Sequence, residues 1–256
     1  MSSSHGTKWL VEHRSGTVAD LHASSAALVS PNDVPVSPLA RTARCLQPID
    51  SALVLGSSQP ETVADASACA RAGVGLVRRR SGGGAVLVQP GAQLWVDLVV
   101  PAGDPLFDED VARAAWWVGE AWALALRHAG LAGAEAWKGQ LLRRPWGSIA
   151  CFALLGAGEV TVPDVTATDV TATDVTASVP GRQWPKVVGV SQRRTRLGAL
   201  FQCSCLLRWE PAELAALLAL SPPEREQASR ELRDVALAAP AGDGEQLFEE
   251  LLAVLP

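Results

Sequence analysis

The chain has 256 residues, of which 48% are hydrophobic, and a formal net charge of −5 at pH 7. This length and content suffice for a substantial core in one large domain, or in one domain with a small appendage. The acidic balance argues against a nucleic-acid partner. The five scattered cysteines argue against a disulfide framework.

The apolar segments of the chain indicate neither export nor membrane insertion. Residues 1–8 are polar and lack the apolar core of a signal peptide. The longest apolar run, near residues 114–126, is interrupted by Gly119 and Glu120 and is too short to span a bilayer. We therefore expect no membrane association and a reduced, cytoplasmic setting.

Turn and capping residues divide the first half of the chain into short elements. Helices are expected at residues 15–28, 61–72 and about 108–128, from N-cap candidates at their starts or glycines at their ends. Residues 30–38, rich in proline, serine and asparagine, predict a loop. Strands are expected at residues 51–56, 75–80, 85–88 and 94–100.

The second half begins with a five-residue repeat. Asp-Val-Thr-Ala-Thr starts at Asp164 and recurs, with one change, at Asp169 and Asp174. Its period fits neither a helix nor a strand, so we expect a low-complexity surface loop over residues 159–180. Further on, strands are expected at residues 186–190 and 199–207, with a basic turn at 193–198 between them. Helices are expected at residues 211–220, 223–237 and 244–254.

This order of elements indicates the class of fold. Strands dominate the middle of the chain and helices flank them, so the expected class is α+β. We expect one main domain over residues 1–210 and a helical C-terminal tail, residues 211–256, packed on it.

A run of arginines and glycines connects two of the predicted strands. It reads Arg78-Arg79-Arg80-Ser81-Gly82-Gly83-Gly84-Ala85. Glycines let the backbone approach a ligand closely, their amides can hold an anion, and arginines supply paired donors. The run is neither a P-loop, since Gly-Lys-Ser/Thr is absent, nor a dinucleotide fingerprint, since it leads into a strand. A glycine-rich hairpin with solvated arginines explains the pattern equally well.

Two further residues are candidates for chemistry. Lys186 begins an apolar strand and can bind a developing acyl oxyanion or acyl phosphate, although a strand-end lysine more commonly extends to water. Cys151 can carry an acyl thioester, or can be a small buried core residue. Cys203 and Cys205 alternate along a strand, which does not suit one metal ion. No metal-ligand spacing is visible, and the histidines lie outside these motifs: His5, His13, His22 and His128.

Taken in order, these motifs resemble the lipoate-protein ligase and octanoyltransferase family of the biotin/lipoate A/B protein ligase superfamily. Residues 79–86 are similar to its arginine-serine-triple-glycine-alanine motif, and residues 186–192 to its lysine motif; the resemblance covers about residues 50–210. It implies a catalytic domain over residues 1–210 with a mixed β-sheet core flanked by helices and a tunnel for an acyl chain. The implied catalytic residues are Lys186 and Cys151. The implied substrate and nucleotide ligands are Arg79, Arg80, Ser81, Gly82, Gly83, Gly84, Ala85, Gly189 and Ser191.

The chain departs from the family pattern at three places. Many relatives have a histidine shortly after the glycines, where Val88 stands here, and another around Gln202 and Cys203. The glycine-basic pair before the lysine is displaced to Gly181-Arg182. These departures suggest altered substrate choice or lost activity.

The resemblance leaves three functions open. The preferred one is a lipoate-protein ligase that attaches a lipoyl or octanoyl group to a carrier lysine through an acyl-adenylate, using ATP and Mg²⁺. An octanoyltransferase would instead move octanoyl from acyl carrier protein to Cys151 and then to the lysine. A non-catalytic acyl- or cofactor-binding protein is the third. The implied partners are lipoyl domains of 2-oxoacid dehydrogenases or an H-like protein of glycine cleavage, and biotin is a more distant substrate.

Overall fold

The computed structural model describes residues 8–29, 39–163, 184–240 and 244–256. The predicted loop at residues 30–38 and the repeats that begin at Asp164 lie outside the described residues. No helix in the described ranges is long and apolar enough to cross a membrane.

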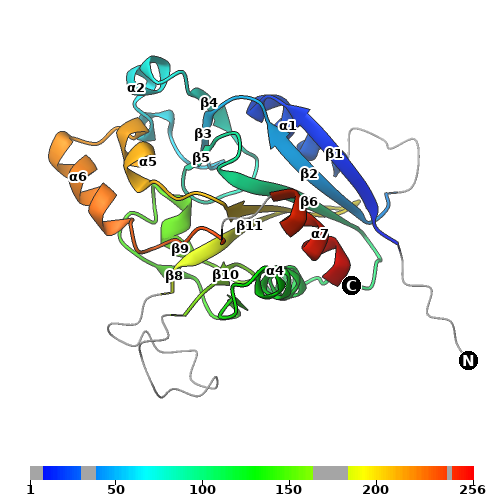
Figure 1. The fold of residues 1–256 in the computed structure, drawn as a ribbon. Coiled ribbons are helices and arrows are strands. Elements are labelled where there is room, and N and C mark those ends of the chain that lie inside the picture. Colours follow the sequence, from blue (N-terminus) through cyan, green and yellow to red (C-terminus); the bar gives the residue numbers. More distant parts are fainter. Residues whose placement is uncertain (1–7, 30–38, 164–183, 241–243) are drawn as a thin grey trace, which may run out of the picture.

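A seven-stranded mixed sheet forms the centre of the molecule (Figure 1). The first two strands of this sheet are parallel and every other neighbouring pair is antiparallel. The mixed sheet confirms the α+β class. In sheet order the strands are β1 (Leu10–Gly16), β2 (Thr42–Pro48), β6 (Gln93–Pro101), β12 (Gly198–Leu206), β11 (Lys186–Thr195), β10 (Val160–Thr161) and β7 (Glu135–Ala136).

Two helices cover one face of the main sheet (Figure 1). They are α4 (Trp116–His128) and α7 (Gly244–Val254), which also contact each other, and the short α3 (Val111–Ala114) precedes α4. Trp122, Phe201 and Phe248 are at most 1% exposed in the core between these helices and the strands. Burial of such large side chains is the main stabilising contribution on this face.

A second, three-stranded sheet lies over the opposite face (Figure 1). Its order is β4 (Gly75–Arg78), β3 (Ala52–Leu55) and β5 (Val86–Val88). The helix α1 (Val18–Leu28) packs beside it and begins at Thr17, whose hydroxyl accepts a hydrogen bond from the Asp20 amide at 3.1 Å. Facing side chains of the two sheets and of α1 form a small separate core that includes Leu46, Val54 and Trp95.

The remaining elements are η1 (Glu61–Val63), α2 (Ala66–Arg71), β8 (Leu142–Arg143), η2 (Cys151–Ala153), β9 (Leu154–Leu155), α5 (Pro211–Leu217) and α6 (Pro222–Glu231). Of these, α2, η2, α5 and α6 pack against Leu53 and Leu55 on the outer face of the second sheet. The segment after α6 pairs with the start of β11, because the Lys186 amide donates to Val235 and the Leu237 amide donates to Lys186. The segment that follows α6 is therefore bonded to the strand that carries the lysine motif.

Several sequence predictions differ from the structure. The helix expected at residues 61–72 is broken, because Asp65 caps a separate α2 through the Ala68 amide. Residues 160–161, expected to begin the loop, form β10. Arg193 and Arg194 lie within β11 and not in a turn, since the ladder with β12 continues to Thr195. The Arg194 guanidinium packs over the Phe107 ring, which accommodates this basic strand end.

Candidate active site

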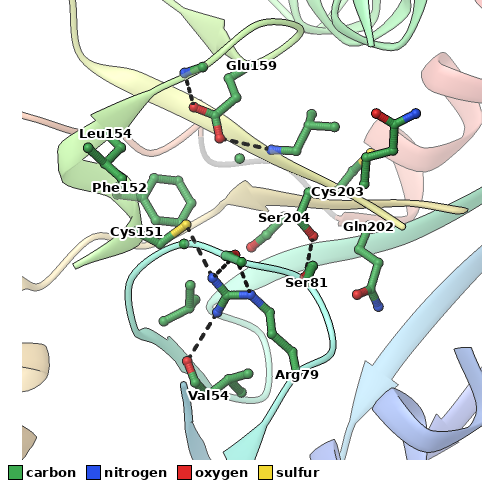
Figure 2. Close-up of a pocket in the computed structure, with 18 of the residues that line it drawn as sticks. Val54, Arg79, Ser81, Cys151, Phe152, Leu154, Glu159, Gln202, Cys203 and Ser204 are labelled. Atoms are coloured by element: carbon green, nitrogen blue, oxygen red, sulfur yellow. Dashed lines mark hydrogen bonds between the residues drawn. The ribbon is translucent and has the colours of Figure 1, made fainter. Parts of the chain in front are cut away.

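A cavity of about 280 Å³ lies between the main sheet and the second sheet (Figure 2). This volume is near the lower end of the roughly 300–1,000 Å³ typical of small-molecule sites. Its apolar wall suits a short hydrocarbon chain and is formed by Val54, Val86, Val88, Leu141, Phe152 and Leu154. Its polar lining comes mainly from the sheet face and includes Ser81, Gln93, Ser191, Gln202 and Ser204.

The glycine turn folds around its own arginine. Arg79 is 6% exposed, and its Nη2 donates to the carbonyl oxygens of Gly82 and Gly84, both at 2.8 Å. Gly83 has φ +102°, which favours glycine. A Cβ added to Gly84 would stand 2.6 Å from the Ala150 carbonyl carbon. The second and third glycines therefore satisfy a backbone requirement of this fold.

The structure divides the predicted ligand residues of this turn into two groups. Four line the cavity: Arg79, Ser81, Gly82 and Gly83. The Ser81 hydroxyl stands 3.1 Å from that of Ser191 and so joins the turn to β11. The other three do not line the cavity: Arg80 is exposed, and Gly84 and Ala85 pack against residues 149–151.

Cys151 lies at the cavity wall beside the glycine turn. It is half-buried, and its Sγ stands 3.9 Å from Arg79 Nη2 (Figure 2). Its amide donates to the Ala85 carbonyl at 3.0 Å, so the backbone that follows the glycines fixes its position. The structure thus brings together two predicted elements that are about 70 residues apart in the sequence.

Lys186 lies directly behind this wall. Its side chain is 0% exposed, and Nζ donates to the Cys151 carbonyl at 3.0 Å, the Leu154 carbonyl at 2.8 Å and Glu159 Oε1 at 2.9 Å. These three acceptors use all three ammonium protons. The aromatic ring of Phe152 lies 4.8 Å from Nζ and shields it further. Lys186 is therefore adjacent to the cavity through its partners and does not line it.

Glu159 is the site residue that the sequence did not reveal. It lines the cavity, its Oε2 accepts from the Gly156 amide at 2.7 Å, and its Oε1 accepts from the Val190 amide at 3.3 Å (Figure 2). Gly189 also lines the cavity, and a Cβ there would stand 3.8 Å from Lys186 Nζ. A buried ion pair held by further hydrogen bonds fixes both partners in place.

Two titratable groups, one half-buried and one buried, adjoin the polar side of the cavity. Burial, and then the positive charge of Arg79, lower the pKa of His22 to about 4, so this cavity-lining imidazole is neutral at pH 7. Burial raises the pKa of Asp97 to about 6, against hydrogen bonds that include one from Trp95 Nε1 at 3.1 Å. Asp97 lies behind Gln202, its cross-strand neighbour. Neither group belongs to a motif that sequence reasoning could have recognised.

The departures from the family pattern fall on the cavity itself. Val88, Gln202 and Cys203 all line it. The cavity therefore has valine, glutamine and cysteine side chains at the positions where the family resemblance implies histidine. The cavity lining of this chain therefore differs from the expected family pattern at these three positions.

Beyond Ser191 on β11, Arg193 is subject to the positive charge of Arg80. Burial, and then the positive charge of Arg80, lower the pKa of Arg193. Arg193 lies two residues beyond Ser191 on β11, so both side chains point to the same face. Its Nη1 is buried without a hydrogen-bond partner in the described structure. A guanidinium with an unused donor, under the influence of a second positive charge, is suited to an anionic group.

Comparisons with known proteins agree with this fold and site. Residues 34–239 match the family model of the lipoyl protein ligase A/B catalytic domain, and the chain therefore belongs to this family. This confirms the resemblance drawn from the glycine and lysine motifs, and the family's fold supports an acyl-transfer enzyme. No curated protein sequence matches the chain significantly.

Solved structures share the fold at low sequence identity. A bipartite lipoate protein ligase from Thermoplasma acidophilum, studied with its E2 lipoyl domain, has a TM-score of 0.68 and 15% identity over 97% of this chain and 82% of that one. Lipoate-protein ligase A bound with ATP has a TM-score of 0.60 and 20% identity, covering 95% and 81%. Protein Ta0514 of T. acidophilum with bound lipoic acid has 0.55 and 19%, covering 96% and 94%.

Proposed function

We propose that the chain transfers a lipoyl or octanoyl group to the lysine of a lipoyl carrier domain, with Cys151 as the nucleophile. The observation that carries this proposal is the position of Cys151 in the wall of the cavity, with its sulfur 3.9 Å from the Arg79 guanidinium. An acyl chain suits the apolar wall, and the thiol lines the same cavity, which supports attack on the acyl carbonyl there. A relative studied with its lipoyl domain supports the class of acceptor.

The cysteine route has two balanced steps. The Cys151 thiol loses its proton and attacks the acyl thioester of a donor such as acyl carrier protein. A new thioester forms, the donor carbon–sulfur bond breaks, and the released donor sulfur takes up the proton as a thiol. The lysine amine of the carrier domain then attacks this thioester, forms an amide and restores the Cys151 thiol. The positive charge of Arg79 stabilises the negative charge that sulfur carries in both steps.

Lys186 has a positioning role in this scheme. Its ammonium binds the carbonyls of Cys151 and Leu154 and so holds the segment that presents the thiol. All three of its donors are engaged, so a direct contact with an acyl oxygen would require it to give up one of these acceptors. We therefore assign Lys186 to positioning and not to contact with the substrate.

An ATP-dependent ligase is the second candidate, favoured by the two guanidinium groups of Arg80 and Arg193. They offer charge and an unused donor for the phosphate of a nucleotide or an acyl-adenylate. Glu159 is the one carboxylate among the described lining residues, and both of its oxygens accept hydrogen bonds. The described lining residues thus do not offer Mg²⁺ a free carboxylate, and the ion would arrive with the nucleotide phosphates.

Mass spectrometry of a lipoyl domain tests the proposal. The domain is incubated with the chain and octanoyl-carrier protein in one tube, and with the chain, ATP, Mg²⁺ and free lipoate or octanoate in another. Octanoylation in the first tube alone, lost in Cys151→Ser, is the expected result. Modification in the second tube alone would establish the ligase instead. If octanoate binds saturably but the lipoyl domain is modified in neither tube, the chain is a non-catalytic acyl-binding protein.

A further inference from the structure

Three side chains with metal-ligand chemistry converge at an edge of the main sheet, on the face opposite the cavity. They are His13 of β1, Cys45 of β2 and Glu245 in the first turn of α7. His13 and Cys45 are direct partners in the parallel ladder, and Cys45 belongs to the core beneath α4 and α7. One ligand atom from each residue lies within 4.8 Å of the other two. Residues distant in sequence thus form one compact cluster.

The distances in this cluster are close to those of a tetrahedral metal site. With bonds of about 2.0–2.3 Å, neighbouring ligands of zinc stand roughly 3.3–3.8 Å apart. His13 Nδ1 and Glu245 Oε1 already stand 3.8 Å apart. Cys45 is 3% exposed and held by its strand, whereas the His13 and Glu245 side chains are 43% and 47% exposed. The two exposed side chains can therefore move by the small distance that coordination needs.

We propose that His13, Cys45 and Glu245 bind one Zn²⁺ ion, with water as the fourth ligand. Imidazole nitrogen, thiolate sulfur and carboxylate oxygen are the three donor types that zinc takes in proteins. Zinc binds cysteine as the thiolate, so the Cys45 thiol releases its proton to solvent as the Cys45–zinc bond forms.

The site would fasten the C-terminal helix to the N-terminal strand. At the far end of α7, the Pro256 carbonyl already accepts hydrogen bonds from Trp9 Nε1 at 3.0 Å and Arg41 Nη1 at 2.7 Å. At the near end, the edge of the His13 ring contacts Phe248 with ring centroids 5.4 Å apart. A zinc ion there gives the first turn of α7 an equivalent anchor. Its effect is therefore on stability, at a distance from the acyl cavity.

Titration of the purified full chain with ZnSO₄ tests the site, after treatment with a chelator and in a thiol-free reductant. We expect one ion per chain, and a Tm that rises by about 5–10 °C when free zinc is about 100 times Kd. Co²⁺ in place of zinc should give a near-ultraviolet sulfur-to-cobalt charge-transfer band. Absence of saturable binding would overturn the proposal.

Matched variants decide which residues hold the ion. His13→Ala and Glu245→Gln, both at exposed positions, should each weaken zinc binding by at least 10-fold, and Cys45→Ala should remove the cobalt band. His128→Ala is the control, because His128 and Glu250 form a similar 3.3 Å pair, between α4 and α7, that is not part of the His13 cluster. It should leave the affinity unchanged. Full affinity in His13→Ala, or a cobalt band that persists in Cys45→Ala, would contradict the assignment.

Discussion

The Lys186 ammonium and the Glu159 carboxylate form a 2.9 Å ion pair that is almost completely removed from water. It connects the start of β11 with the segment that carries Cys151, since the same ammonium binds the Cys151 carbonyl. The pair can therefore stabilise the fold and also position Cys151 for acyl transfer. Substitution of one partner, compared with substitution of both, separates the effect on stability from the effect on transfer.

Removal of one partner of this pair should be costly. Lys186→Met leaves the Glu159 carboxylate buried without its counter-charge, and we expect a loss of about 3–5 kcal/mol in the free energy of unfolding. Acyl transfer to the lipoyl domain should fall below detection. Chemical denaturation and mass spectrometry of the acceptor measure the two effects. Turnover equal to wild type in a folded Lys186→Met would rule out any role of the lysine in transfer.

The double variant Lys186→Met with Glu159→Gln separates stability from activity. A neutral pair should recover most of the lost unfolding free energy, because no unpaired charge stays buried. The amide oxygen of the introduced glutamine can still accept from the Gly156 amide, as Glu159 does at 2.7 Å. Transfer should nevertheless stay absent, because the ammonium that holds residues 151–154 is missing. Recovery of activity together with stability would show that the pair acts only through folding.

Cys151 should be essential for the thioester route and dispensable for adenylation. Cys151→Ser should lower transfer from octanoyl-carrier protein by more than about 1,000-fold and abolish a covalent octanoyl-enzyme in intact-mass spectra. Cys69→Ser is the matched control, since Cys69 is 2% exposed and packs against the C-terminal helices. Lipoate-dependent ATP–pyrophosphate exchange that persists in Cys151→Ser would identify the ligase route.

The glycine turn and the lysine strand could be predicted from the sequence because each is encoded by a short run of consecutive residues. Consecutive glycines and an apolar strand that begins with lysine can be recognised without any partner. Glu159 had no such signal, since it follows a glycine-alanine-glycine turn and gains its meaning only when β11 approaches. β1 was missed because most of its residues are exposed, so no alternating apolar pattern marks it. The zinc cluster combines positions 13, 45 and 245, which only the folded chain brings together.

The glycines of the turn should differ sharply in their tolerance of a methyl group. Gly84→Ala places a Cβ 2.6 Å from Ala150 and should displace the Cys151 segment, at a cost of about 1–3 kcal/mol in stability and with loss of transfer. A Cβ at Gly82 meets nothing within 4 Å, although Gly82 lines the cavity. Gly82→Ala should therefore keep wild-type stability. Equal thermal unfolding curves for the two variants would contradict this account.

Asp97 should make the protein less stable as the pH rises. Its pKa is about 6 in the fold, against the ordinary aspartate value of 3.8, so the folded state binds the proton more tightly. Its stabilising contribution is therefore complete below about pH 3.8 and is lost as the pH rises through 6. At pH 7 the buried carboxylate costs about 3 kcal/mol, because its pKa is raised by about two pH units.

Asp97→Asn removes this titration while it keeps an oxygen to accept from Trp95 Nε1. Relative to wild type, the variant should gain up to about 3 kcal/mol in unfolding free energy at pH 7 and little at pH 4. The difference between the two proteins cancels the contributions of the other titrating groups, His22 included. Urea unfolding of both proteins between pH 4 and 7 measures it. A difference that stays constant over this range would show that Asp97 does not titrate in the fold as described.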